Sequence, residues 1–484
     1  MVRSILSASL ARPHWQRGPF RIEGPDEDPF TLGVQALRLL GDPVRAEGFQ
    51  TLHRLHLAGS FPAEAEWAFG EALGIPGLEV RRHGVGSSSV WGALAAATHD
   101  PAAPARQAVI AADVAERTTG HLAGPETGHG AGAIAFLLGA EPGLRLLNHG
   151  FRDHAPGRGP PVRSTIAGWI EAAGFSRGGS GGEVILNTSG DGARWQGAWE
   201  ELAPGVTVTP VDVSPDGLGN APTARPAYLV WELARRLRTG RIGIVAEATA
   251  SRSGYAAFRL EGPVRWSGEW GPAGPGILPH SARFSERNPD LGAVSQGAYL
   301  PHPRYIENLA SRWRLVGERC PECRALTFPT RGRCHACGRS EGLSPEPLRR
   351  TGLEVEAVTT ISSGAQPTEF DFLVEATGGY DVALVGLDSD ARATFQVTDA
   401  YPGSLRVGAR VRLVLRRLYP MESEWRYGLK AVPESVAESP GPAGPASVPL
   451  LRPGAKASSS APRAHPSSPR TPSGRAGSRR RRAR

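Results

Sequence analysis

The four cysteines of this chain form two pairs with the same spacing. Two residues separate Cys320 from Cys323, ten residues follow, and Cys334 and Cys337 repeat the pattern. A tight turn can aim both thiolates of such a pair at one point, so two pairs supply the four sulfur ligands that zinc prefers. Four sulfurs leave no open coordination position, which predicts a structural zinc ion in a ribbon of turns.

The alternative is two disulfides in an exported protein. No signal peptide is recognisable at the start of the sequence, and disulfides seldom persist in the cytosol. Zinc is therefore the favoured interpretation. We therefore expect a cytoplasmic protein. No run of eighteen apolar residues occurs, so we expect no membrane span.

The net charge of +8 belongs to the end of the chain. Residues 434–484 carry ten Lys or Arg and two Asp or Glu, a net +8, so residues 1–433 sum to zero. The same segment is rich in Pro, Ser and Ala and has almost no large apolar side chains, which predicts a disordered basic tail. The basicity is thus no argument for nucleic-acid binding by the folded part.

Helix-like and strand-like segments alternate through the first 260 residues in two successive rounds. Helical spacing or small apolar residues predict helices at 30–40, 62–73, 91–98, 164–173 and 225–237. Apolar runs predict strands at 108–112, 131–138, 183–186, 206–213, 241–248 and 256–260. This alternation predicts an α/β fold class: a layered, duplicated α/β domain.

The rest of the chain is predicted to be mostly β-structure. Gly and Pro separate strand-like runs at 353–361, 380–387, 392–397, 410–415 and 425–431, which indicates a small barrel. We expect five parts: the α/β domain at 1–262, a connector at 263–302, a helix and the zinc ribbon at 303–340, the barrel at 341–433, and the tail at 434–484.

The block from 319 to 433 resembles the zinc-ribbon plus OB-fold proteins that associate with thiolases and acyl-CoA enzymes. The matching segments are CPEC and CHAC around Phe328-Pro329, the run 380–388 (YDVALVGLD), 405–411 (LRVGARV) and 427–430 (YGLK). The resemblance implies a rubredoxin-like ribbon and an OB-fold barrel that scaffold a partner enzyme or help to place acyl-CoA, without chemistry of their own.

The block from 1 to 262 resembles the thiolase superfamily, above all hydroxymethylglutaryl-CoA synthases and initiating ketoacyl synthases. The segments that carry the resemblance are 26–32 (DEDPFTL), 128–138 (GHGAGAIAFLL) and 218–225 (LGNAPTAR). It implies a thiolase-like layered domain, a coenzyme A thioester as ligand, a homo-oligomer, and an oxyanion-orienting role for Asn220.

The catalytic residues of that superfamily are not matched. Its cysteine nucleophile opens a buried helix, and here that helix reads GSSSVWGAL, which puts Ser87, or Ser88 with a one-residue shift, at the cysteine position. No cysteine precedes Cys320, and no histidine lies between His154 and His280, where the resemblance would place a catalytic histidine. A serine hydroxyl needs a positioned base to attack a thioester.

The sequence therefore favours a non-catalytic subunit that binds acyl-CoA or a cysteine-bearing thiolase or condensing enzyme. Such a subunit would serve carbon–carbon bond formation or cleavage, or acyl transfer, on a thioester. One alternative is an acyltransferase or synthase-like enzyme that uses Ser87 and Asn220. The other is a nucleic-acid-binding OB-fold protein, which the net charge of −3 over residues 341–433 (ten basic, thirteen acidic) disfavours.

Overall fold

A computed structural model gives the fold of the chain. It describes residues 2–17, 20–21, 24–41, 52–102, 106–114, 130–154, 161–174, 182–188, 192–211, 218, 221–248, 252–270, 276–277, 301–388, 391–421 and 424–434. Residues 435–484 of the predicted tail and most of the predicted connector at 263–302 lie outside these ranges.

One large sheet organises the N-terminal part. Its strands follow the order β10-β9-β11-β12-β8-β1-β7-β6-β4-β5, and β13 pairs with β1 on the side. The bounds are β1 Ser4–Ala11, β4 Arg54–Gly59, β5 Glu79–Arg82, β6 Gln107–Asp113, β7 Gly132–Gly139, β8 Leu144–Asp153, β9 Glu183–Thr188, β10 Thr207–Pro210, β11 Ile242–Ala248, β12 Arg252–Leu260 and β13 Arg265–Trp270. The short strands β2 (Trp15–Arg17), β3 (Phe20–Arg21) and β14 (Gly276–Ile277) form a separate small sheet.

The large sheet is two copies of one arrangement. Outward from its centre, both β8-β12-β11-β9-β10 and β1-β7-β6-β4-β5 have two antiparallel pairings followed by two parallel ones. This repeat confirms the layered α/β class expected from the sequence. It also explains why helices and strands alternate twice along the chain, since each parallel pairing needs a crossover helix.

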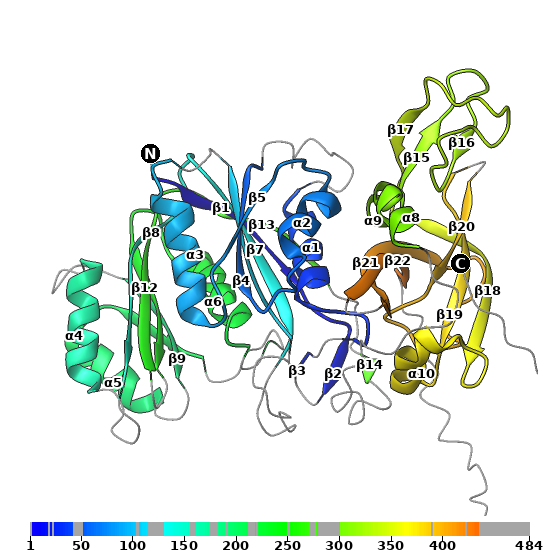
Figure 1. The fold of residues 1–484 in the computed structure, drawn as a ribbon. Helices are drawn as coiled ribbons and strands as arrows, with labels where there is room; N and C mark the ends of the chain where they lie inside the picture. The colour runs from blue at the N-terminus through cyan, green and yellow to red at the C-terminus, as the bar shows by residue number, and fades with distance from the viewer. Residues whose placement is uncertain are drawn as a thin grey trace, which may run out of the picture. The chain divides into compact units, whose positions relative to one another are not determined.

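The two copies form the two arms of the sheet, β8-β12-β11-β9-β10 and β1-β7-β6-β4-β5. Helices cover both arms in layers (Figure 1). Side chains of the neighbouring strands β4 and β6 alternate: Leu57 and Ile110 pack with α1 (Pro29–Leu40) and α2 (Ala65–Leu73), while Val109 packs with α3 (Ser87–His99). The cluster around α3 and α6 (Ala224–Arg236) also contains Val245 and Phe258 of the other arm, so these two helices lie between the arms. The outer face of that arm is covered by α4 (Val162–Ala173) and α5 (Gly192–Leu202).

The C-terminal module begins with two short helices, α8 (His302–Glu307) and α9 (Leu309–Arg314). Next comes a three-stranded ribbon of β15 (Val316–Arg319), β16 (Leu326–Thr327) and β17 (Ser344–Pro347). A five-stranded sheet follows in the order β20-β19-β18-β21-β22, and a bridge between Val397 and Ala431 joins its two ends. Its elements are β18 Leu353–Ser362, η3 Thr368–Phe370, α10 Asp371–Thr377, β19 Gly379–Gly386, β20 Arg392–Gln396, β21 Arg410–Met421 and β22 Glu424–Pro433. The strands form the expected small barrel, and its OB-fold topology stays a prediction.

The acidic turn before α1 is buried against β21 and β22 of the barrel. Asp26 Oδ2 lies 2.9 Å from Lys430 Nζ, and both side chains are at most 1% exposed. Arg416, also fully buried, lies 2.9 Å from Glu27 and 3.0 Å from Asp399. Burial alone would raise the pKa of Asp26, but Lys430 and Arg416 together hold it below its usual value. Removing one partner of such a buried pair leaves an uncompensated charge, so either single loss should destabilise the contact between the two parts.

Asp28 connects the same contact to the start of α1. One of its carboxylate oxygens accepts the backbone N–H of Thr31 at 2.9 Å and caps the helix, while the other accepts the hydroxyl of Tyr427 at 2.8 Å. The ring of Phe30 packs edge-on against Tyr427, with 5.0 Å between ring centroids. One apolar cluster therefore continues from α1 and α2 into β21 and β22.

His56, in the middle of β4, is fully buried. Gln107 donates its amide N–H to the carbonyl of Ala97 at 2.9 Å, so its Oε1 faces His56 Nε2 at 3.0 Å and accepts from it. His56 Nδ1 then accepts from His83 Nε2 at 2.9 Å. Burial, with the nearby charges of Arg54 and Arg81 and the His83 ring, lowers the pKa of His56 to about 4.

This histidine predicts an acid-sensitive fold. Above pH 6.5 the imidazole is neutral in both states, but between pH 6.5 and 4 only the unfolded chain takes up the proton. The free energy of unfolding should fall across that window by up to about 3 kcal/mol. Denaturant titrations at pH 7.5, 6 and 5 measure the effect. His56→Gln should reduce the slope and His335→Gln, on the exposed ribbon, should keep it; equal slopes in the wild type and His56→Gln would contradict the assignment.

Candidate functional site

The four cysteines of the ribbon converge as the sequence predicts. Their Sγ atoms all lie within 4.8 Å of one another, with 3.6 Å between Cys320 and Cys337 and 3.5 Å between Cys323 and Cys334. A zinc ion with Zn–S bonds of about 2.3 Å needs sulfurs about 3.8 Å apart, so the set fits tetrahedral zinc. His335 does not join them, because its Nδ1 lies 3.2 Å from the hydroxyl of Thr327.

The ribbon is built onto the barrel by its apolar side chains. Leu326, between the two cysteine pairs, is 1% exposed and packs in the same cluster as Leu353, Val385 and Leu413 of the barrel. Cys320 and Cys334 are buried while Cys323 and Cys337 are exposed, so one side of the site faces the module and the other faces solvent. The arrangement supports a structural metal that orders the ribbon against the barrel.

Ser87 is the first residue of α3, and its role as a catalytic residue stays a prediction. The residue before it, Gly86, has a φ of 93°, which favours glycine and turns the chain into the helix. Ser87 is 5% exposed, and its hydroxyl donates to the carbonyl of Pro222 over a long 3.5 Å. Ser88, the alternative in a shifted register, is exposed.

A carboxylate that sequence reasoning missed lies beside Ser87. Glu247 is near the end of β11, close enough to Ser87 for the serine hydroxyl to favour its ionised form. Burial raises the pKa of Glu247, and the Ser87 contact opposes that rise only in part. Glu247 Oε2 is buried and has no hydrogen-bond partner among the described residues. The signal in the sequence was a lone carboxylate within the apolar run IGIVAEA.

Asp113 and Thr223 connect the start of α6 to the start of α3 by hydrogen bonds. One of its oxygens accepts the backbone N–H groups of Thr223 and Ala224, at 2.6 and 2.7 Å, and so caps the start of α6. Burial raises the pKa of Asp113 to about 6, although these N–H groups act in the other direction. The hydroxyl of Thr223 in turn accepts the backbone N–H of Gly86 at 2.9 Å. The starts of α3 and α6 are thus fixed side by side.

The structure brings Ser87 and the start of α6 together, and the remaining predicted residue, Asn220, lies outside the described residues. Among the described residues, the Ser87 hydroxyl contacts the carbonyl of Pro222 and influences the carboxylate of Glu247, and no hydrogen bond joins it to an imidazole.

The fold and the cysteine site together define the class of protein. It has a zinc-ribbon and β-barrel module joined to a layered α/β domain. A family model described as "ChsH2, rubredoxin-like zinc ribbon domain" matches residues 309–343. A DUF35 domain-containing scaffold protein of Methanothermobacter thermautotrophicus is 30% identical over 136 residues, which are 27% of this chain and 96% of that protein. The chain belongs to the family of DUF35 domain-containing scaffold proteins.

Two further comparisons concern a second curated relative and a solved structure. A DUF35 domain-containing scaffold protein of Methanocaldococcus jannaschii is 29% identical over 115 residues, 24% of this chain and 77% of that protein. A 3-oxoacyl-(acyl carrier protein) synthase III of Pseudomonas aeruginosa PAO1 matches in structure with a TM-score of 0.41 and 13% identity, over 54% of this chain and 99% of that one. A likeness at this level says nothing about activity. Within the described ranges, none of the helices has both the length and the apolar character needed to cross a bilayer.

Proposed function

We propose that this chain is a non-catalytic scaffold subunit for a thiolase-type condensing enzyme that carries its own cysteine nucleophile. The ribbon and barrel act as the scaffold module, and the α/β domain is held on that module within the same chain. The complex would act on acyl-CoA thioesters, in carbon–carbon bond formation or cleavage or in acyl transfer, in the cytoplasm.

One observation carries this proposal: buried charged side chains of the barrel form ion pairs with the α/β domain. Lys430 and Arg416 of the barrel are fully buried against Asp26 and Glu27 of the α/β domain. Residues committed to such a contact bind another protein surface and are not available to a substrate. The relatives that consist mostly of the matched segment carry the name scaffold, which supports the same role for the module here.

The residue at the start of α3 in the α/β domain also supports a non-catalytic role. Ser87 replaces the nucleophilic cysteine of the resembling enzymes, and a helix N-terminus stabilises an anion there by only about 1 kcal/mol. That is far less than the difference in acidity between a hydroxyl and a thiol. The partner would therefore provide the nucleophile.

Purification from the native host tests the proposal. The full chain, tagged and expressed at its normal level, should retain a cysteine-bearing thiolase or condensing enzyme in a fixed ratio through a wash of moderate ionic strength. Tagging that enzyme should recover this chain in the same ratio. A chain that elutes alone in both directions would overturn the scaffold role.

A second candidate function rests on Glu247. If its carboxylate takes the Ser87 proton while Oγ attacks a thioester carbonyl, the C–S bond breaks and the leaving thiolate recovers that proton. A carboxylate with a raised pKa is a better base near neutral pH than an ordinary one. This acyltransferase alternative predicts an acyl ester on Ser87, which the scaffold function does not.

A further inference from the structure

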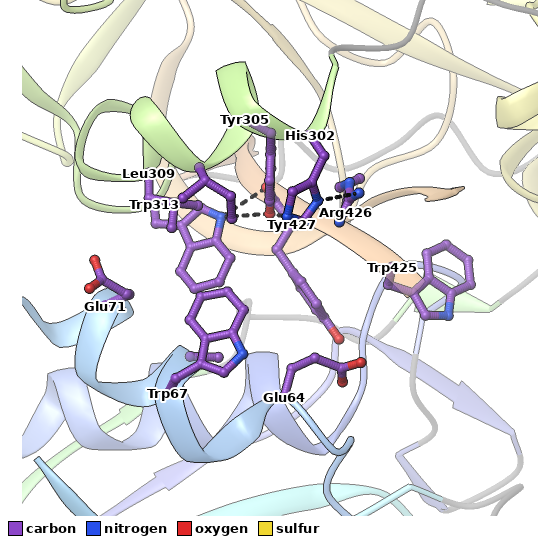
Figure 2. Close-up of a pocket in the computed structure, with 12 residues that line it drawn as sticks. Glu64, Trp67, Glu71, His302, Tyr305, Leu309, Trp313, Trp425, Arg426 and Tyr427 are labelled. Carbon is purple, nitrogen blue, oxygen red and sulfur yellow. Dashed lines mark hydrogen bonds between the residues drawn. The ribbon is translucent and has the colours of Figure 1, made fainter. Parts of the chain in front are cut away.

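A cavity of about 470 Å³ lies between α2 of the α/β domain and α8, α9 and β22 of the C-terminal module (Figure 2). Five of its twelve lining residues are Trp or Tyr, namely Trp67, Tyr305, Trp313, Trp425 and Tyr427. The volume is that of a site for a small molecule or a large side chain. Nothing in the proposed scaffold role so far uses it.

The polar atoms of the inner rings are already satisfied. Trp313 Nε1 donates to the carbonyl of Tyr427 and to the hydroxyl of Tyr305, each at 3.0 Å, and the hydroxyl of Tyr427 donates to Asp28 at 2.8 Å. These rings therefore offer the cavity their apolar faces and edges. An occupant is recognised by stacking and by the charged groups at the rim.

Trp67 is the exposed ring of this wall. Its side chain is 46% exposed although it stacks on buried Trp313, with 5.7 Å between centroids and 15° between planes. Glu64 and Glu71, three residues before it and four after, lie on either side of it in Figure 2. Neither carboxylate forms an ion pair with any described residue, whereas Glu66, off this cavity, pairs with Arg82 at 3.2 Å.

Other rings of the cavity already stack with guanidinium groups. Arg417 lies over Trp425 at 4.4 Å from its centroid, and Arg426 lies over Tyr305 at 5.0 Å. No described cation occupies the corresponding place over Trp67. An exposed indole between two acidic side chains has the chemistry that binds a flat organic cation.

We propose that this face of α2 receives an arginine side chain of a partner protein. The guanidinium stacks on Trp67 and pairs with Glu64 and Glu71, while the aliphatic part of the side chain packs on apolar ring surface beside them. Arg426 on the opposite wall is 5% exposed and directs its guanidinium to Tyr305 and to His302 Nδ1, 2.8 Å away, so it leaves the acidic side open to a second cation. The partner is the condensing enzyme of the proposed function, on which this inference rests for the partner's identity alone.

The test uses the full chain and N-acetyl-arginine amide as the probe. Protein labelled with 5-fluorotryptophan gives one fluorine resonance per indole, and Trp67→Phe assigns the resonance of Trp67. The probe should shift that resonance in a saturable way, N-acetyl-lysine amide should bind more weakly, and N-acetyl-norleucine amide should not bind. Glu64→Gln combined with Glu71→Gln should weaken arginine binding by about fivefold, while Glu66→Gln should leave it unchanged.

Two results would overturn the inference. Equal binding of the norleucine and arginine probes would mean that the cavity takes any apolar group. Tighter binding of N-acetyl-glutamate amide than of the arginine probe would mean that Arg426 and His302 set its preference. Because the probe is added to the isolated chain, this test stands even where the condensing enzyme fails to co-purify, so the two proposals can fail separately.

Discussion

Replacing Lys430 with methionine is expected to lower the free energy of unfolding by about 3–5 kcal/mol. The methionine keeps the length of the side chain but leaves the Asp26 carboxylate, 2.9 Å away and fully buried, without its closest cation. Urea unfolding, monitored by tryptophan fluorescence, measures this loss of stability in the first unfolding transition that the urea titration shows. Asp26→Asn in the Lys430→Met background should recover part of the loss, because it removes the buried charge that the first change left alone.

Arg410→Met is the matched control for this experiment. Arg410 lies on β21 of the same hairpin, but its pairing with Glu354 is longer, at 3.6 Å, and both side chains are more than half exposed. A surface pair of this kind contributes at most about 1 kcal/mol. If Lys430→Met and Arg410→Met cost the same, the buried contact does not hold the module to the α/β domain, and the support that it gives to the scaffold role is lost.

Replacing Cys334 with serine should remove nearly all bound zinc from the protein. The freshly purified wild type is expected to carry about one zinc ion per chain, because the four sulfurs have tetrahedral spacing. Binding free energies of about 10–16 kcal/mol are typical of structural zinc, so the ribbon should lose its order without the ion. Since Leu326 packs into the barrel cluster, the barrel should lose stability as well.

Elemental analysis and thermal unfolding of the same samples measure both effects. His335→Ala is the control, since this residue lies between the cysteines of the second pair but hydrogen-bonds to Thr327 and is no ligand. It should retain the zinc and most of the stability. Wild-type protein that carries no zinc when freshly prepared would contradict the metal assignment.

Much of the architecture follows from periodic patterns in the sequence. The predicted helices at 30–40, 62–73 and 225–237 correspond to α1, α2 and α6, and α2 ends at Gly74, whose φ is 71°. The strands at 108–112 and 131–138 are β6 and β7. These segments are buried on one or both faces, so apolar spacing reports their structure directly.

The central strands were harder to predict because polar residues interrupt their patterns. The strand β1 reads SILSASLA, and its Ser9 is fully buried with its hydroxyl bonded to the carbonyl of Ala36 at 2.7 Å. Only this tertiary contact makes serine compatible with the middle of a sheet. The strand β8 likewise contains Asn148 and His149, and β13 lies in the segment expected to be a connector.

The functional contacts could not be predicted, because they join residues far apart in the chain. Asp26 and Lys430 are separated by about four hundred positions, and one sequence gives no means to pair them. Glu247 and Ser87 are brought near each other by β11 and α3, whose apolar side chains share one cluster. Spacing reveals a site when its residues are neighbours along the chain, which is why the cysteines were predictable.

The distinction between scaffold and enzyme depends on one hydroxyl group. Ser87 is at the start of a buried helix, its hydroxyl partly opposes the rise that burial causes in the pKa of the nearby Glu247 carboxyl, and no cysteine precedes Cys320 in the chain. General base catalysis is worth about 10²–10⁴-fold, and a carboxylate alone does not convert a serine into the equal of a cysteine thiolate. We therefore expect Ser87 to stay unmodified in the presence of thioesters.

Intact-mass spectrometry of the full chain after incubation with acetyl-CoA or acetoacetyl-CoA tests this most directly. The predicted result is an unchanged mass for the wild type and for Ser87→Ala and Glu247→Gln alike. A stable acyl adduct on the wild type that is absent from Ser87→Ala and reduced in Glu247→Gln would contradict the non-catalytic role and establish the acyltransferase in its place.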